Sequence, residues 1–239
     1  MLVAVTCDRR LGRGHDGPRV RPGRAEVWVS ELTLDHLRAA GLTPILLPPG
    51  GTDMETVLGA VAGVVITGGA FDIHPAHYGD AVTARLDRVD QARTGLELAL
   101  VRECRRRHKP LLGICGGMQA LVVGLGGGLL QHVDGHEQDE DPALPGHAIT
   151  CEPGWEWLGG AVNSTHHQAV DPDRLGETTV VARAADGVIE AVAVPRMGML
   201  GVEWHPELLA APGSSAVFTY FADQVRSGDR SGMYAGSLP

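Results

Sequence analysis

Short, almost uninterrupted hydrophobic runs alternate along the chain with longer stretches whose hydrophobic positions recur at helical spacing. Such continuous runs are typical of strands that are covered on both faces. We predict strands at Leu2–Thr6, Pro44–Leu47, Gly63–Thr67, Leu111–Ile114, Thr178–Arg183, Val188–Val194 and Met199–Trp204. The helical spacing predicts helices at Val27–Ala40, just after Asp53, and at Gln91–His108, Gly117–Leu125 and Ser214–Arg226.

This alternation predicts an α/β fold: a doubly wound, mostly parallel sheet flanked by helices, of the flavodoxin-like kind. We see no repeat or linker that divides the chain, so we expect a single domain over residues 1–239. The acidic stretch Asp134–Asp141 is the segment we expect to be a mobile loop. In such a fold ligands bind beyond the carboxyl ends of the strands, so we look for chemistry there.

Composition excludes several functions. The net charge is −9, from 29 acidic and 20 basic residues, so we expect no nucleic-acid partner. Lys109 is the only lysine and Pro110 follows it, which excludes a phosphate-binding P-loop. The four cysteines are too sparse for a disulfide framework. The N-terminus does not resemble a signal peptide, and the apolar run 110–133 is rich in glycine, so we expect a cytoplasmic protein without a membrane partner.

The strongest candidate for chemistry is the sequence Gly113-Ile114-Cys115-Gly116-Gly117, which lies between a predicted strand and a predicted helix. It is the cysteine form of the nucleophile elbow, G-x-S-x-G. Small residues on either side let strand and helix pass closely, and the helix N-terminus favours a thiolate. The amide of Gly116 would face an oxyanion formed on attack. A buried structural cysteine between packing glycines is the alternative.

A possible base for Cys115 follows the last predicted strand, in His205-Pro206-Glu207. Strand ends gather at one edge of the sheet, so His205 could reach Cys115, and Glu207 could fix the imidazole tautomer. Glu203 is the other acid nearby. Two glycines, Gly68 and Gly69, end another predicted strand and could supply further oxyanion donors, although a plain tight turn would explain them as well.

The histidines do not predict a metal site. His166 and His167 are adjacent, and neighbours in a strand point to opposite faces. Cys104 and His108 lack further ligands, and we expect His136 to lie in a solvated loop with His132. Gly124–Gly128 does not match a dinucleotide-binding fingerprint. We therefore expect neither a metal nor another cofactor.

Five stretches together carry a resemblance to a known family. They are ITGGAFDIHPAHYGD (66–80), LLGICGGMQALVVGLGGGLLQHV (111–133), VNSTHHQAV (162–170), ARAADGVIEAV (182–192) and GVEWHPE (201–207). In this order they resemble the class I glutamine amidotransferase-like superfamily and, within it, the γ-glutamyl hydrolase branch, peptidase family C26. The chain departs from that branch at Gly116, where its hydrolases usually have arginine, and at Thr94, where aspartate is common.

The resemblance implies a Cys–His–Glu triad of Cys115, His205 and Glu207, and an oxyanion hole at Gly69 (or Gly68) and Gly116. It also implies that Gln119 and the segment of Ser164, Thr165, His166 and His167 hold the glutamyl group. We expect cysteine-dependent hydrolysis of the γ-glutamyl amide of a small-molecule γ-glutamylated amine, such as γ-glutamyl-GABA, through a thioester. A glutaminase subunit that feeds ammonia to a synthase and a non-catalytic binding module remain alternatives, and the chain could form a homodimer.

Overall fold

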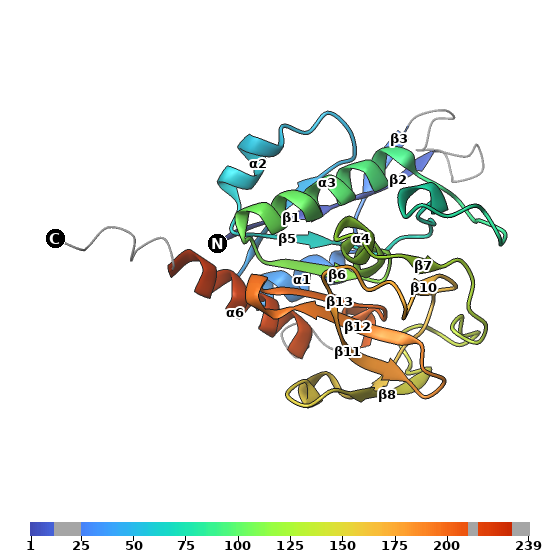
Figure 1. Cartoon of the computed structure of the whole chain (residues 1–239). Coiled ribbons are helices and arrows are strands. Elements are labelled where there is room, and N and C mark those ends of the chain that lie inside the picture. Colours follow the sequence, from blue (N-terminus) through green and yellow to red (C-terminus); the bar gives the residue numbers. More distant parts are fainter. Residues whose placement is uncertain (12–24, 210–214, 231–239) are drawn as a thin grey trace, which may run out of the picture.

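The structure is a computed structural model that describes residues 1–11, 25–209 and 215–230. Within these ranges a nine-stranded sheet has the order β4-β1-β5-β6-β13-β12-β11-β8-β9 (Figure 1). Its strands are β1 (Leu2–Thr6), β4 (Thr43–Leu47), β5 (Gly63–Ile66), β6 (Leu111–Ile114), β8 (His147–Cys151), β9 (Gly160–Val162), β11 (Thr179–Ala184), β12 (Ile189–Val194) and β13 (Met199–Val202).

The sheet has two halves. From β4 through β1, β5 and β6 to β13, every neighbouring pair is parallel. From β13 through β12, β11 and β8 to β9, every pair is antiparallel. The predicted α/β fold with a largely parallel, helix-flanked central sheet is confirmed, and the antiparallel strands extend it on one side.

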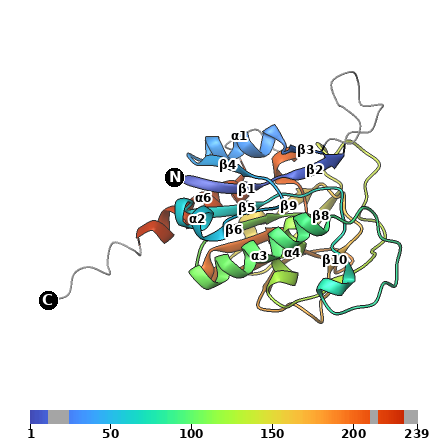
Figure 2. The same cartoon turned by 90° about the horizontal axis from the view of Figure 1, so that it is seen from above.

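Helices cover both faces of the parallel half (Figure 2). On one face lie α1 (Glu31–Ala39) and α6 (Ala216–Arg230), and on the other lie α2 (Met54–Ala60), α3 (Gln91–Arg107) and α4 (Gly116–Gly124). Successive residues of β1 point to opposite faces, as the strand geometry requires. Val3 and Val5 pack in the core with α1 and α6, whereas Ala4 packs in the core with α3 and α4.

Most predicted strands and helices are found within a residue or two of their expected limits, but the predicted helix Val27–Ala40 is wrong in its first part. Residues Ala25–Trp28 form strand β3, which pairs with β2 (Asp8–Leu11) as an antiparallel ladder. The helix begins only at Glu31, after the extended residue Ser30. Val27 and Trp28 contribute to the hairpin instead of to a helical face, because pairing with a distant strand overrides local spacing.

Several short strands were not predicted. They are β7 (Leu129–Leu130), which pairs with β10 (Ala169–Val170), and the antiparallel strands β8 and β9. Strands of two or three residues are too short to show a periodic pattern, and the five residues of β8 include the polar His147 and Thr150. No helix among the described residues combines the length and the apolar character needed to span a membrane.

The acidic stretch that was expected to be a mobile loop is anchored to the rest of the chain. His136 is only 2% exposed, and Glu137 forms an isolated antiparallel bridge with Thr165. Asp134 and Asp139, by contrast, are exposed to solvent, as expected for an acidic loop. The expectation is therefore wrong for His136, whose ring turns inward. The segment before Gly23, which is rich in arginine, glycine and proline, lies largely outside the described residues.

Candidate active site

Cys115 lies in a sharp turn between β6 and α4. Its backbone dihedrals are φ 51° and ψ −114°, a region that non-glycine residues rarely occupy. A Cβ on Gly113 would lie 2.4 Å from the carbonyl oxygen of Gly117, and one on Gly117 would lie 2.1 Å from that of Ile66. The strand and the helix therefore pass so closely that the two flanking positions need glycine, as the elbow motif predicts.

The turn brings Cys115 to His205, which follows β13. Gly68 lies between them: a Cβ on Gly68 would be 3.2 Å from Cys115 Cβ and 3.3 Å from His205 Nε2. The imidazole forms a hydrogen bond with the Cys115 side chain. Its other nitrogen, Nδ1, lies 2.9 Å from Glu207 Oε1. The structure thus brings Cys115, which follows β6, to the segment of His205 and Glu207, which follows β13.

Charge at this site favours a protonated imidazole. Burial by itself would lower the pKa of His205. The hydrogen bond to Cys115, the charge of its thiolate and the nearby Glu207 carboxylate outweigh burial and raise the pKa of His205 well above its usual value. A histidine in this state can hold a neighbouring sulfur as thiolate and later donate a proton.

Asn163 fixes the backbone of His205, a role that the sequence did not reveal. Its Oδ1 accepts a hydrogen bond from the amide of His205 at 2.7 Å, and its Nδ2 donates to the carbonyl of His205 at 3.0 Å. Nδ2 also donates to the carbonyl of Pro142 at 2.6 Å. Asn163 is fully buried, so these bonds lock the turn that carries the imidazole.

Arg93, from the first turn of α3, orients the glycine turn after β5. Its Nη2 donates to the carbonyls of Thr67 (2.6 Å) and Gly68 (2.9 Å). In a trans peptide the N–H points opposite to the C=O, so the amide of Gly69 points away from Arg93. A Cβ on Gly69 would lie 2.4 Å from Arg93 Nη1, which leaves this position no room for a side chain.

Two buried acids neutralise Arg93. Glu97 accepts from its Nε at 2.7 Å, and Asp8 lies 3.2 Å from its Nη1. The guanidinium is fully buried, and its burial opposes the charged form, but Glu97 and then Asp8 raise the pKa of Arg93 above its usual value. The ring of Phe71 lies 4.3 Å from the guanidinium carbon. The sequence does not reveal this role of Arg93, because its partners Asp8 and the glycine turn are far from α3 in the chain.

Two cavities meet at Cys115. The larger has a volume of about 420 Å³, and Asp8, Trp28, Val29, Ser30, His205 and Leu208 are among its lining residues. The smaller, of about 130 Å³, is lined by residues that include Phe71, Asp72, Gly116, Gln119 and Glu137. Gly69, Ala70, Cys115 and Thr165 line both. A molecule that spans the two cavities would therefore pass directly over the sulfur.

The smaller cavity contains most of the residues that were expected to hold a glutamyl group. Gln119, Thr165, His166 and His167 all line it. Ser164 lines neither cavity: its hydroxyl donates to the carbonyl of His136 at 2.7 Å. The structure therefore gives no support to a substrate contact from the side chain of Ser164.

Both side-chain amide hydrogens of Gln119 already form hydrogen bonds within the protein. Its Nε2 donates to Glu203 Oε1 at 2.5 Å and to the carbonyl of Gln168 at 3.2 Å. Glu203 is fully buried, and this burial, more than any neighbour, raises its pKa well above the usual value for a carboxyl. Glu203 thus supports Gln119 from behind the cavity, and Gln119 can offer a bound molecule only its carbonyl oxygen.

His167 and Asp72 line the smaller cavity and contact each other. His167 Nε2 lies 2.8 Å from Asp72 Oδ1, and Asp72 Oδ2 accepts from the amide of Asp87 at 2.6 Å.

Among the described residues, His136, His147 and Glu190 form a separate group whose side chains converge closely enough to hold a metal ion.

Comparison with known proteins finds relatives in sequence and in fold. A 37% identical region covers 79% of the chain and 66% of a Mycobacterium tuberculosis protein named provisionally as a glutamine amidotransferase. The γ-glutamyl-γ-aminobutyrate hydrolase of Escherichia coli is 32% identical over 87% of the chain and 85% of that enzyme. A crystal structure of a Thermotoga maritima glutamine amidotransferase superposes with a TM-score of 0.59, at 16% identity, over 98% of this chain and 85% of that one.

The chain covers 66% of the M. tuberculosis protein, just under two thirds of its length, so the similarity applies only to the matched region. The structural likeness, at its low identity, bears on the fold alone. The model of the family Peptidase C26 matches residues 2–207, from the first strand of the sheet to Glu207. The chain therefore belongs to the Peptidase C26 family, as a glutamine amidotransferase-like hydrolase.

Proposed function

We propose that this protein hydrolyses the γ-glutamyl amide bond of a γ-glutamylated amine and releases glutamate, with Cys115 as nucleophile. The observation that carries the proposal is the placement of Cys115 in a strained turn, hydrogen-bonded to His205, at the junction of two cavities. An amide substrate has two halves joined at a carbonyl. The junction is where that carbonyl would lie.

In the first step the Cys115 thiolate attacks the γ-carbonyl carbon, and the carbonyl oxygen becomes an oxyanion. The amide of Gly69, turned inward by Arg93, and the amide of Gly116, in the first turn of α4, would donate to it. Gly68 could contribute in place of Gly69. Protonated His205 then gives its proton to the leaving nitrogen, the C–N bond breaks, and a γ-glutamyl thioester remains on Cys115.

In the second step water attacks the thioester. His205, now neutral, takes a proton from the water, and the collapse of the second tetrahedral intermediate expels the Cys115 thiolate and glutamate. Glu207 keeps the Nδ1 proton of the ring in place throughout, so that Nε2 is the nitrogen that exchanges protons with the substrate. The thiolate and the imidazolium are restored for the next cycle.

The smaller cavity suits the glutamyl half. Its volume of about 130 Å³ is small, and its lining is polar enough for an amino-acid head group. The carbonyl oxygen of Gln119 and the carboxylate of Asp72 would accept from an α-ammonium, and His167 would approach the α-carboxylate. Thr165, which lines both cavities, lies beside the scissile bond in this arrangement.

The larger cavity would then receive the leaving amine. Among the described residues its lining includes no lysine or arginine, and its two acids, Asp8 and Glu207, are already paired with Arg93 and His205. Indole and aliphatic side chains, from Trp28, Val29 and Leu208, make up part of the wall. This lining favours a neutral or cationic amine over one that ends in a carboxylate, as the amine half of γ-glutamyl-GABA does.

The names of the relatives suggest two candidate reactions, hydrolysis of γ-glutamyl-GABA and release of ammonia from glutamine. A volume of about 420 Å³ on the amine side favours a leaving group larger than ammonia. The direct test is a panel of γ-glutamyl amides read by glutamate release: a diamine, an uncharged alkylamine, GABA, an α-amino acid, and free glutamine.

We expect kcat/KM to be highest for the uncharged or cationic amines, lower for γ-glutamyl-GABA and lowest for glutamine. Cys115→Ala should abolish release from every member while the far-UV circular dichroism spectrum stays unchanged. Activity on glutamine alone, rising when a synthase partner is added, would support the glutaminase alternative instead. Undiminished release by Cys115→Ala would refute the proposal.

A further inference from the structure

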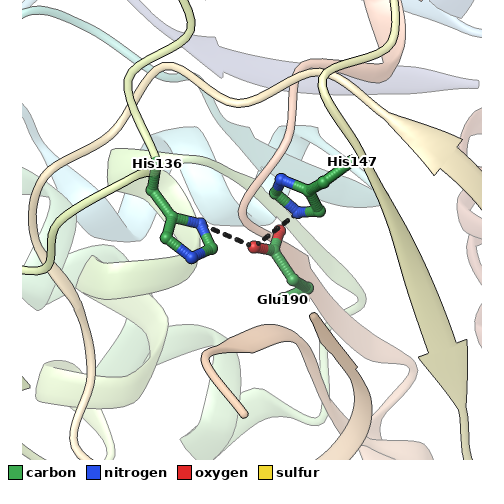
Figure 3. A group of neighbouring side chains, drawn as sticks. All are labelled: His136, His147 and Glu190. Atoms are coloured by element: carbon green, nitrogen blue, oxygen red, sulfur yellow. Dashed lines mark hydrogen bonds and ion pairs between the residues drawn. The ribbon is translucent and has the colours of Figure 1, made fainter. Parts of the chain in front are cut away.

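A second cluster of titratable side chains, His136, His147 and Glu190, lines neither cavity at Cys115 and takes no part in the proposed reaction. His136 and His147 point toward the carboxylate of Glu190 from two sides (Figure 3). His136 Nδ1 lies 3.2 Å and His147 Nε2 lies 3.0 Å from the same oxygen, Glu190 Oε1. The potential ligand atoms of all three residues lie within 4.8 Å of one another.

The two separations from Glu190 Oε1 are close to those of a tetrahedral metal site. With metal–nitrogen and metal–oxygen bonds of about 2.0–2.2 Å, neighbouring ligands of a tetrahedral zinc ion lie about 3.3 Å apart. The observed separations of 3.0 and 3.2 Å are slightly shorter than this edge. A small outward movement of the two rings would therefore open a space for an ion.

The hydrogen bonds of His136 leave a lone pair directed at the carboxylate. Its Nε2 lies 3.0 Å from Asp186 Oδ2, and because a carboxylate only accepts, Nε2 must carry the ring proton. In the neutral ring Nδ1 is then an acceptor that faces another acceptor, Glu190 Oε1. Ser164 Oγ, 3.4 Å from Nδ1, cannot resolve this conflict, since its one hydrogen goes to the carbonyl of His136.

His166 shows the same conflict on another side of the cluster. Its Nδ1 lies 2.9 Å from the carbonyl of Gln168, an acceptor, so Nε2 is the lone-pair nitrogen of the neutral ring. Nε2 lies 3.7 Å from Glu190 Oε1. Among the described side chains, His166 Nε2 and Glu190 Oε2 are both buried polar atoms without a hydrogen-bond partner. A second proton on each ring, or a divalent cation with its water, would satisfy these atoms.

We propose that His136, His147 and Glu190 bind a zinc ion, with a water molecule as fourth ligand that donates a hydrogen bond to His166 Nε2. Two imidazoles and one carboxylate are a ligand set that zinc accepts. The contact of His136 with Asp186 is the outer carboxylate–histidine pairing that commonly orients a metal-bound imidazole. The sequence alone predicts no metal here, because the ligands come from segments far apart in the chain.

The proposed ion would have a structural role. Glu190 lies on β12, His147 begins β8, and His136 lies in the segment between β7 and β8. One ion would therefore fasten β8 and β12 of the antiparallel half to the segment that carries Glu137, which lines the smaller cavity. Zinc should raise the melting temperature of the protein, since a ligand that binds only the folded state stabilises it.

The test is metal binding by the full chain, stripped with a chelator and titrated with zinc against a chromogenic chelator. The titrations are made in the Cys115→Ala background, so that the active-site thiol cannot contribute. We expect one zinc ion per chain, an increase in melting temperature with zinc, and no comparable effect of magnesium or calcium, which prefer oxygen ligands.

His147→Ala and Glu190→Gln should each weaken zinc binding by at least ~10–100-fold. Loss of a residue that only hydrogen-bonds to a metal ligand already has an effect of this size, and here the ligand itself is lost. His147 is partly exposed, so its variant carries the test if the fully buried Glu190 proves indispensable for folding. The matched control is His132→Ala, which removes an exposed histidine 3.1 Å from Asp134 in the same segment and should leave zinc binding unchanged.

Two results would overturn the proposal. One is the absence of saturable zinc binding by the stripped chain, which would leave the cluster as a buried network of protonated histidines. The other is zinc binding that His147→Ala leaves intact or that His132→Ala weakens equally. Glutamate release is measured separately and does not enter the readout, so the proposed function could fail while the metal site stands.

Discussion

At the scale of single residues, the four cysteines differ mainly in burial and in their neighbours. Burial raises the pKa of Cys104 to about 12, and it also raises the pKa values of Cys7 and Cys151. A thiol with a pKa of about 12 is thiolate to only about one part in 10⁵ at pH 7. Cys115 alone of the four is hydrogen-bonded to a histidine whose charged form is favoured.

We therefore expect iodoacetamide to alkylate Cys115 far faster than the other three cysteines at pH 7. Peptide mapping by mass spectrometry after short exposures measures the four rates in one sample. His205→Ala should slow the modification of Cys115 and leave the rates at Cys7, Cys104 and Cys151 unchanged. Equal rates at all four cysteines in the folded protein would contradict an activated Cys115.

Glu207 should control the alkaline limit of activity. His205 must be protonated to expel the amine, and its raised pKa keeps it protonated to higher pH than an ordinary histidine. Activity is therefore retained as pH rises above the usual histidine pKa of about 6.5 and falls only as pH passes the raised value. Because Glu207 is one cause of the increase, Glu207→Gln should move this fall to lower pH.

The same variant should also lower kcat, by up to about 10⁴-fold, the loss known for the corresponding Asp→Asn change in a serine-protease triad. The measurement is kcat against pH for both proteins on one substrate. Glu156→Gln is a suitable control, since Glu156 is an exposed acid that accepts from the amide of Gly154. An alkaline limit that does not move in Glu207→Gln would show that Glu207 does not act through His205.

At the scale of elements, the site depends on how closely β6, α4 and β5 approach one another. Gly117→Ala would place a methyl group 2.1 Å from the carbonyl oxygen of Ile66, so the elbow must shift. We expect a loss of about 1–3 kcal/mol in the free energy of unfolding and a large fall in kcat. Denaturant titration and steady-state kinetics measure the two effects.

Gly95→Ala provides the matched control. Gly95 is an exposed residue within α3, and a Cβ there would have no neighbour within 4 Å. Alanine favours a helix over glycine by about 1 kcal/mol, so this variant should be more stable and fully active. If Gly117→Ala were as stable and as active as Gly95→Ala, the account of the elbow as a close approach would be wrong.

The elements also show what the sequence could predict. The strands of the parallel half, the helices that cover them and the elbow were predictable, because buried strands and amphipathic helices have strong periodic signals. The hairpin β2–β3 was not, because Ala25–Trp28 is apolar enough to pass as the start of a helix and its partner is distant in sequence. The antiparallel strands β8 and β9 are too short or too polar to show a pattern.

At the scale of the whole molecule, the fold brings together residues whose relation the sequence does not show. Cys115, His205 and Glu207 were predictable as candidates, because each follows a predicted strand and ends of parallel strands converge. Arg93 and Asn163 were not predictable as positioning residues, because their contacts are with backbone groups of distant segments. The cluster of His136, His147 and Glu190 was hidden for the same reason.

The whole molecule also determines which half of a substrate goes where. The two cavities lie on either side of Cys115 because the glycine turn and the segment around Thr165 border both of them. The hairpin residue Trp28 lines only the larger one. Differences in the amine that is accepted are therefore expected to follow from the larger cavity, while the glutamyl half is shared by all substrates.

In the proposed reaction a γ-glutamyl group is transferred to Cys115. The most direct test is to trap this acyl group on the cysteine. The full chain is mixed with a γ-glutamyl amide, quenched in acid within the first turnover, digested and analysed by mass spectrometry. We expect a γ-glutamyl thioester on the peptide that contains Cys115, and none on Cys7, Cys104 or Cys151. Rapid glutamate release with no acyl group on Cys115, or release that persists in Cys115→Ala, would contradict the proposed reaction.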